Sequence, residues 1–386
     1  MPLSSHRLAP ILRALALATS FTALPIGAAI AQANLSSQGF GFPPGQFSAR
    51  THGTGVALAE MDPLSPVNPA SIAALGTRLL FFQIEPEFRS VTTNNGTERT
   101  TTARYPNVFG ALPIQGLVLS LGSSTLLDRT STTVFNTTQT LSTNEVVPIT
   151  TRFRVDGAMD DVRLAAGWAP ASWLRVGLGA HAITGHNLVS ITQSFADSSS
   201  FASFTQQRIL GFSGAAVSAG VQFVSKSVNA AFSARRGGNL DLTDEDTVLS
   251  KAKVPNRFGA SIAYTGIANS AISVRTSRDD WSSLRGLGSP GLRPVDAWDT
   301  SIGADMAGPR LGDRIVFLRG GFRTRTLPFT AAENRVKENS ITGGFGTAFA
   351  GNRVLMDLAV IHASRSAALE ASERAWTVSL GISVRP

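Results

Sequence analysis

The chain has 386 residues, a formal net charge of +8 and only 16% charged residues, and it contains no cysteine. The lack of cysteine excludes a disulfide scaffold, thiol catalysis and cysteine-ligated zinc. Glycine (36 residues) and phenylalanine (22 residues) are plentiful, which is not the composition of a disordered chain. The positive charge is spread along the chain without a Lys/Arg block or a nucleic-acid-binding motif, so we expect no nucleic-acid partner.

Residues 1–31 predict a cleaved signal peptide. Arg7 and Arg13 give a positively charged start, an apolar stretch follows, and Ala29-Ile30-Ala31 supplies the small residues of a cleavage site. The apolar stretch is short, is interrupted by proline and glycine, and has no basic stop-transfer cluster after it, which favours a signal over an uncleaved anchor. We therefore expect an exported protein that begins at Gln32.

Residues 32–76 differ in composition from the rest of the chain and predict an irregular segment with one short helix. Asn68 suits the N-cap of a helix and Pro69 its first position, and Gly76 suits the C′ position, so the helix is predicted over residues 69–75. The residues of this segment that we single out are Gly53, Gly55, Asp62, Asn68 and Pro69.

Residues 77–386 carry the pattern of membrane-spanning strands. No apolar run after the signal approaches the ~20 residues that a membrane helix needs, whereas stretches that alternate apolar and polar side chains recur. Residues 161–168 and 174–180 alternate in this way and predict a hairpin, with Trp168 and Trp173 beside its turn as in an interfacial aromatic girdle. The final alternating stretch, 376–384, is typical of the strand that closes a barrel.

The fold class predicted is therefore all-β, a transmembrane antiparallel β-barrel. The alternating segments indicate about twelve to sixteen strands. Residues 92–102 and 130–144 are polar and are interpreted as long loops. A soluble β-sandwich also alternates and is the alternative, but the polar faces are rich in Gly, Ser and Thr, which favours a barrel.

Several stretches resemble the FadL-type family of outer-membrane transporters for long-chain fatty acids and other hydrophobic compounds, which is related to a shuttle protein of type IX secretion. They are Asp62 with Asn68-Pro69-Ala70, the stretch Val254 to Tyr264, Asp280-Trp281-Ser282, and Leu318 to Phe329. The resemblance implies that residues 32–76 form a hatch inside a barrel of about 14 strands. It also implies that hydrophobic substrates leave sideways through the wall.

Arg319, Arg323 and Arg325 share one face of a predicted strand with Phe317. Inside a barrel they would offer cations to a carboxylate head group beside an apolar surface for its tail. The alternative is an ordinary polar lumen, or a rim that contacts lipopolysaccharide.

Catalysis, metal binding and cofactors are not indicated. His181 and His186 invite an acid–base reading, but no lipase motif surrounds them. The acidic stretch 241–246 lacks the glycine and the spacing of a calcium loop and is interpreted as a solvated loop tip. We expect a protein that is not an enzyme.

The leading hypothesis is a channel of the bacterial outer membrane that takes up small hydrophobic molecules passively, gated by the hatch. Its expected partners are outer-membrane lipid and lipopolysaccharide, a hydrophobic small-molecule ligand, and the barrel-insertion machinery during assembly. Two alternatives remain: a binding or shuttle protein for secreted partners, and a general porin.

Overall fold

The computed structural model describes residues 35–38, 40–93, 96–140, 146–196, 201–287, 293–312, 314–331, 334–367 and 371–386. The predicted signal peptide, 1–31, lies outside the described residues. Among the described residues, no helix is long and apolar enough to cross a membrane.

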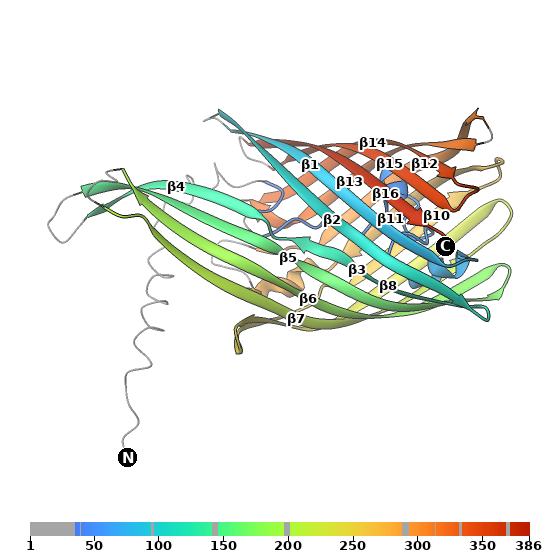
Figure 1. The fold of residues 1–386 in the computed structure, drawn as a ribbon, viewed down its shortest axis with the longest axis horizontal. Coiled ribbons are helices and arrows are strands. Elements are labelled where there is room, and N and C mark those ends of the chain that lie inside the picture. Colours follow the sequence, from blue (N-terminus) through green and yellow to red (C-terminus); the bar gives the residue numbers. More distant parts are fainter. Residues whose placement is uncertain are drawn as a thin grey trace, which may run out of the picture.

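One antiparallel sheet dominates the structure (Figure 1). Its strands are β1 (Leu79–Thr93), β2 (Gly96–Ile114), β3 (Leu117–Asp128), β4 (Ser131–Thr140), β5 (Val146–Ala171), β6 (Leu174–Phe195), β7 (Phe204–Phe223), β8 (Val228–Asp244), β9 (Thr247–Lys253), β10 (Arg257–Tyr264), β11 (Ser270–Asp279), β12 (Ala297–Leu311), β13 (Arg314–Ala331), β14 (Asn334–Phe349), β15 (Val354–Ser366) and β16 (Ser372–Val384). The short helices are α3 (Ala49–Gly53), η3 (Pro69–Ala74) and η4 (Trp281–Leu287), the last two of the 3₁₀ type.

The sheet closes into a barrel because β16 pairs with β1 and β10 pairs with β8. Of the sixteen strands in the described residues, β4 continues the line of β3 along β5, and β9 continues the line of β10 along β8. The wall therefore has fourteen strand positions, two of which are interrupted. This confirms the predicted barrel and its predicted closing strand.

The two ends of the barrel differ. Adjacent strands are joined at one end by short turns such as Gln115-Gly116, and at the other by longer connections such as residues 280–296. Short turns face the periplasm and long loops the outside in bacterial barrels. We use the same assignment here and call the two ends the short-turn end and the long-loop end.

The wall turns an apolar face outward and a polar face into the lumen. The predicted hairpin is confirmed: Leu164 pairs with Ala180, and both Leu164 and Leu178 project from the outer face with more than half of their surface exposed. The alternate residues, including Asp161 and Arg163, are buried in the lumen. A ring of exposed apolar side chains around a closed wall is the arrangement that lipid requires.

Residues 40–76, which we call the luminal segment, pack against the lumen-facing side chains of the wall. Most of this segment is buried. Helix α3 contacts β13 to β16, and η3 contacts β5, β6 and β7. The predicted short helix is confirmed as η3, with the Asn68 side chain accepting a hydrogen bond from the Ala70 amide as its N-cap.

One sequence prediction is wrong. The stretches 92–102 and 130–144 were expected to be loops, but their described parts extend the hairpin of β1 and β2 and form β4. Both stretches are rich in threonine, whose β-branched side chain favours extended backbone, and their polarity reflects exposure to water rather than loop conformation.

An arginine placed on the outer face distinguishes wall that lies in lipid from wall that lies in water. Leu178 is 68% exposed on the outer face of β6, in the part of the wall nearer the short-turn end. Ile209 is 61% exposed on the same face of β7, near the long-loop end. We expect Leu178→Arg to lower the free energy of unfolding by about 2–4 kcal/mol, because a charge at the bilayer midplane is poorly solvated. Ile209→Arg should change it little. Urea unfolding from vesicles, followed by tryptophan fluorescence, measures both, and equal losses would contradict this membrane position.

Candidate functional site

Two glycines of the luminal segment allow it to touch the wall. A Cβ atom added to Gly53 would lie 3.1 Å from the Arg319 side chain, and one added to Gly55 would lie 2.9 Å from the Phe322 backbone nitrogen. Gly55 also has a φ of +62°, a conformation that favours glycine. The predicted hatch glycines therefore serve close packing of the segment against β13.

The polar hatch residues organise the segment itself. Asp62 accepts hydrogen bonds from the hydroxyl groups of Ser48 (2.6 Å) and Ser65 (2.9 Å). Asn68 donates to the Glu60 carbonyl oxygen (2.7 Å) while it caps η3. Pro69 follows as the first residue of η3. The predicted site residues of this segment therefore lie at two parts of the wall, with Gly53 and Gly55 against β13 and Asn68 and Pro69 against β6 and β7.

Glu60 was not singled out in the sequence, yet it joins the segment to the wall. Its carboxylate lies 3.2 Å from Nε of Arg275 and 3.3 Å from Nη2 of Arg257, and it accepts a hydrogen bond from Ser233 (2.6 Å). Burial opposes ionisation of Glu60, but the two guanidinium groups and the Ser233 hydroxyl hold its pKa below its ordinary value. The wall residues that contact Glu60 are distant from it in sequence. The only local signal of its importance was that it lies two residues before the predicted site residue Asp62.

The three predicted luminal arginines do share the lumen-facing side of β13, but each already faces a carboxylate. Arg319 donates to Asp357 (2.7 Å), Arg323 to Asp299 (2.8 Å) and Arg325 to Glu338 (2.6 Å). All three arginines are buried. A direct contact with a ligand carboxylate stays a prediction, and it would have to compete with these ion pairs.

Two phenylalanines of the luminal segment lie among these cations. The Phe42 ring is within 4.6–5.1 Å of the guanidinium carbons of Arg89, Arg104, Arg325 and Arg365. The Phe47 ring is within 5.0–5.6 Å of those of Arg257, Arg275 and Arg323. A ring face attracts cations, so each phenylalanine is held by several contacts of about 0.5–2 kcal/mol.

The wall is open on one side at the level of Phe42. Strand β2 pairs with β3 only through residues 107–114, and no ladder among the described residues joins residues 96–104 of β2 to β3 or β4. In Figure 1, β4 to β7 diverge here from β1 and β2 toward the long-loop end. The unpaired edge begins about eight residues above the short turn, close to the ~9–11 residues that cross a membrane.

The luminal segment closes this opening from inside. The Phe42 amide donates to the Asp128 carbonyl oxygen (2.7 Å), and the Asp128 amide donates to the Phe42 carbonyl oxygen (2.9 Å). The Asp128 carboxylate accepts from Nε of Arg104 on β2 (2.6 Å), so it also spans the unpaired edge. A Cβ atom at Gly41 would lie 2.8 Å from the Asp128 carbonyl oxygen, so only glycine permits this approach.

Beyond the opening, the two faces of the sheet exchange their polarity. On the outer part of β5, Val147 and Ile149 turn inward and are each 4% exposed, whereas Arg152 and Arg154 project outward into solvent. Lower on the same strand the outward residues are apolar and the inward ones are charged. In the extension of β4 to β7 beyond the opening, β5 therefore carries its charges on the outer side and packed apolar side chains on the inner side.

Three neighbouring strands bring Asp161, His181 and Ser218 into a hydrogen-bonded chain. Asp161 Oδ1 lies 2.8 Å from His181 Nδ1, and His181 Nε2 lies 2.8 Å from the Ser218 hydroxyl oxygen. Nucleophilic hydrolases use the same constellation. Here Ser218 is paired with strands on both sides, at Gly179 and Arg235, so the ladders already engage the local amides that an oxyanion hole would need.

The same chain has a structural use. Asp161 also accepts from the Gln46 side chain of the luminal segment (3.0 Å), and Gln46 donates to Ser124 as well (2.7 Å). Asp161, which His181 contacts on its other oxygen, therefore holds Gln46 against the wall. His186, the second histidine noted in the sequence, is exposed and takes no part.

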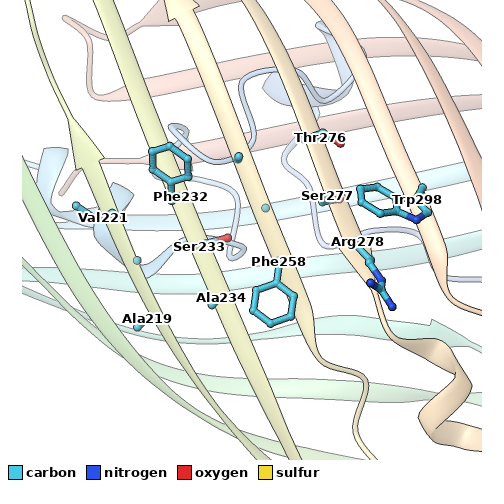
Figure 2. Close-up of a pocket in the computed structure, with 13 residues that line it drawn as sticks. Ala219, Val221, Phe232, Ser233, Ala234, Phe258, Thr276, Ser277, Arg278 and Trp298 are labelled. Atoms are coloured by element: carbon cyan, nitrogen blue, oxygen red, sulfur yellow. The ribbon is translucent and has the colours of Figure 1, made fainter.

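A groove of about 630 Å³ lies on the outer face of the barrel (Figure 2). Phe232, Phe258 and Trp298 line it, with Arg278 at one end, and these are the outward residues of β8, β10, β12 and β11. Arg278 is occupied by Asp296 (2.9 Å) and Asp280 (3.1 Å). Because the groove faces outward in the apolar belt, it is not part of the lumen.

No protein-family model matches the chain, and no curated protein matches it in sequence. Solved structures do match. The matches concern the fold of the closed fourteen-strand wall.

The CymD monoaromatic hydrocarbon channel matches with a TM-score of 0.54 and 14% identity, over 92% of this chain and 98% of that one. The toluene transporter TbuX of Ralstonia pickettii matches with a TM-score of 0.53 and 13% identity, over 91% and 99%. The toluene transporter TodX of Pseudomonas putida matches with a TM-score of 0.54 and 11% identity, over 89% and 99%. At this identity the likeness concerns the fold, and these neighbours are transport channels, not enzymes.

Replacement of Glu60 tests whether it holds the luminal segment. Glu60→Gln leaves Arg257 and Arg275 without their shared carboxylate, and breaking a buried ion pair typically costs about 3–5 kcal/mol. We expect the variant to lose stability and the luminal segment to become sensitive to protease. The matched variant Glu245→Gln, in the exposed turn between β8 and β9, should leave both properties unchanged.

The pH dependence follows from the lowered pKa of Glu60. Its contribution to stability is fully present above the ordinary value of 4.5 and is lost as the pH falls below that value toward the lower folded pKa. The stability difference between the native chain and Glu60→Gln should therefore shrink below pH 4.5, as measured by unfolding in urea. A difference that is constant or grows on acidification would contradict the assignment.

Proposed function

We propose that this protein is an outer-membrane channel for the passive uptake of small hydrophobic molecules and that its luminal segment is the hatch. The single observation that carries the proposal is the opening in the wall between β2 and β3, which Phe42 and Asp128 close from inside. A hydrophobic solute that enters the mouth gains nothing from a polar, ion-paired lumen. It gains a favourable transfer by leaving sideways into lipid.

The apolar inner face of the extension supports the first step. Side chains such as Val147, Ile149 and Val155 stand above the membrane yet turn toward the mouth. These side chains are at most 4% exposed, so they form a packed apolar layer beside the opening, which a hydrophobic solute joins where that packing loosens.

The second step is movement of the hatch at Phe42. Two backbone hydrogen bonds and the cation contacts of its ring hold Phe42 in place. Their displacement opens the inner side of the unpaired edge without disturbing the ladders that close the barrel. The fold of the matched hydrocarbon channels and transporters is consistent with this route.

The two alternative functions differ in what they need from the lumen. A general porin needs a continuous water-filled passage, but Glu60, Asn68 and Gln83 of this chain are buried between the luminal segment and the wall. The extension of β4 to β7 keeps the shuttle alternative open, because it could hold an exported partner. Copurification of a protein partner would favour the shuttle, and steady conductance in a planar bilayer would favour the porin.

The proposal includes the surroundings of the barrel. The apolar belt faces outer-membrane lipid, and the outward arginines of the extension, Arg152 and Arg154, face the level of the lipopolysaccharide head groups. Export through a cleaved signal peptide over residues 1–31 and assembly by the barrel-insertion machinery belong to the same proposal.

A disulfide across the closure tests the gate. Phe42 and Asp128 exchange both backbone hydrogen bonds, so their Cα atoms should be about 5.5 Å apart, within the range that a disulfide bridges. The native chain has no cysteine, so Phe42→Cys with Asp128→Cys introduces the only pair. We expect the oxidised variant to take up radiolabelled dodecanoate at least about tenfold more slowly than the reduced variant, in cells that lack their own channel for it.

The control pair is Thr92→Cys with Thr97→Cys, at paired positions of the hairpin of β1 and β2. This disulfide joins two strands that are already paired and should not change uptake. Equal uptake by the oxidised and reduced forms of the Phe42/Asp128 variant would show that the closure is not the gate.

A further inference from the structure

Two arginines of the lumen, Arg235 on β8 and Arg257 on β10, lie directly opposite each other on paired strands. Like charges in opposed positions repel each other, so the pair needs compensation from anionic groups nearby. The carboxylate of Asp161 lies 3.4 Å from Arg235 and also contacts a histidine. The carboxylate of Glu60 lies 3.3 Å from Arg257 and is shared with a second arginine. The opposed arginines are therefore paired less closely than their neighbours on the wall.

Each of the two guanidinium groups keeps an unused donor. Within the described part of the chain, Arg235 donates only from Nη1 and Arg257 only from Nη2. Nη2 of Arg235 and Nη1 of Arg257 border open space, whereas the Nε atom of each residue is enclosed. Arg323, by contrast, donates from both Nε and Nη2 to one carboxylate at 2.8 Å.

The open space is a small cavity between the luminal segment and the wall. Its volume is about 50 Å³, and both opposed arginines line it. A water molecule needs about 10–15 Å³, so the cavity has room for a few water molecules or one small ion, and none for an alkyl chain. The charged residues that line it are Arg235, Arg257, Arg323, Arg325, Asp279 and Asp299.

The charges of this lining suit one negative charge. Arg323 is paired with Asp299, so these two charges cancel. Arg325 is paired with Glu338, which lies outside the lining. Of the charges that remain, the two opposed arginines exceed Asp279 by one. The Asp279 carboxylate repels a divalent anion such as sulfate more strongly than a monovalent one.

We propose that Arg235 and Arg257 bind a single small monovalent inorganic anion, such as chloride, in this cavity. The anion accepts hydrogen bonds from the two unused terminal nitrogens and neutralises the opposed pair. Arg235 also donates to Gln46 (3.1 Å), and the guanidinium carbon of Arg257 lies 5.6 Å from the centre of the Phe47 ring. The bound anion therefore helps to fix the luminal segment to the wall. It differs from any molecule that the channel would carry, so the inference goes beyond the proposed uptake function.

The test compares chloride with an anion that is too large for the cavity. The full chain in detergent is unfolded with urea in sodium chloride or in sodium gluconate of the same ionic strength, so that screening is equal. A ligand that binds only the folded chain raises the folding equilibrium constant, and we expect a rise of at least about fivefold in chloride. In Arg235→Gln, which lacks one donor of the pair, the two salts should agree within about twofold.

Asp279→Asn should change the effect in the opposite direction. It removes the charge that repels the anion, so the rise in chloride should exceed that of the native chain. Arg152→Gln is the matched control, because Arg152 is exposed on the outward face of β5, and it should respond to chloride like the native chain. Heat-modifiable gel migration confirms that each variant is folded. If Arg235→Gln does not fold, Asp279→Asn still tests the site.

Crystals grown in sodium bromide locate the anion directly, because bromide scatters anomalously. We expect an anomalous peak between the side chains of Arg235 and Arg257. No peak at this position overturns the inference. So does an equal effect of chloride on the native chain and Arg235→Gln, or a chloride effect that Asp279→Asn leaves unchanged or weakens.

Discussion

Charge compensation inside the barrel is the constraint on which the rest of the structure depends. A lumen packed with polypeptide solvates ions poorly, so each buried guanidinium needs a carboxylate, a carbonyl oxygen or a ring face. Most of the pairs join neighbouring wall strands, as between Arg323 and Asp299. Glu60 supplies the acid that Arg257 and Arg275 share, and the Pro43 carbonyl oxygen accepts from Arg325. The luminal segment and the barrel are therefore one folded unit.

The parts of this structure that could be predicted from the sequence are those governed by local periodicity. Alternation along residues 161–180 predicts a hairpin, and Asn68 with Pro69 predicts the start of η3, because one strand or one turn decides each outcome. The acid of the luminal segment that matters most, Glu60, could not be recognised, because its partners on β10 and β11 follow about two hundred residues later. The polar extension was misread as loop because polarity was taken to indicate a turn.

The same reasoning explains why the wall opening has no sequence signature. It depends on which strands fail to pair, and residues 96–104 of β2 look like any other exposed strand. Its position becomes meaningful only together with the end of β3, where Asp128 pairs with Phe42, and with the reversed polarity of β5. Together these features place a packed apolar layer next to an unpaired edge at the level of the apolar belt. In the proposed route, a hydrophobic solute passes from water through this layer to lipid, each a better solvent than the last.

The luminal segment is attached unevenly, and in the proposed route this difference determines where it would move. Around Glu60 it is held by a buried ion-pair cluster and by contacts too close for any side chain, as where Asn68 meets Gly220. At Phe42 it is held by two backbone hydrogen bonds, each contributing about 0.5–1.5 kcal/mol, and by ring contacts with cations that have acids of their own. Displacement of Phe42 leaves no guanidinium unpaired, whereas displacement of Glu60 leaves two. The weak end lies at the wall opening, so the proposed movement of the closure leaves the rest of the luminal segment in place.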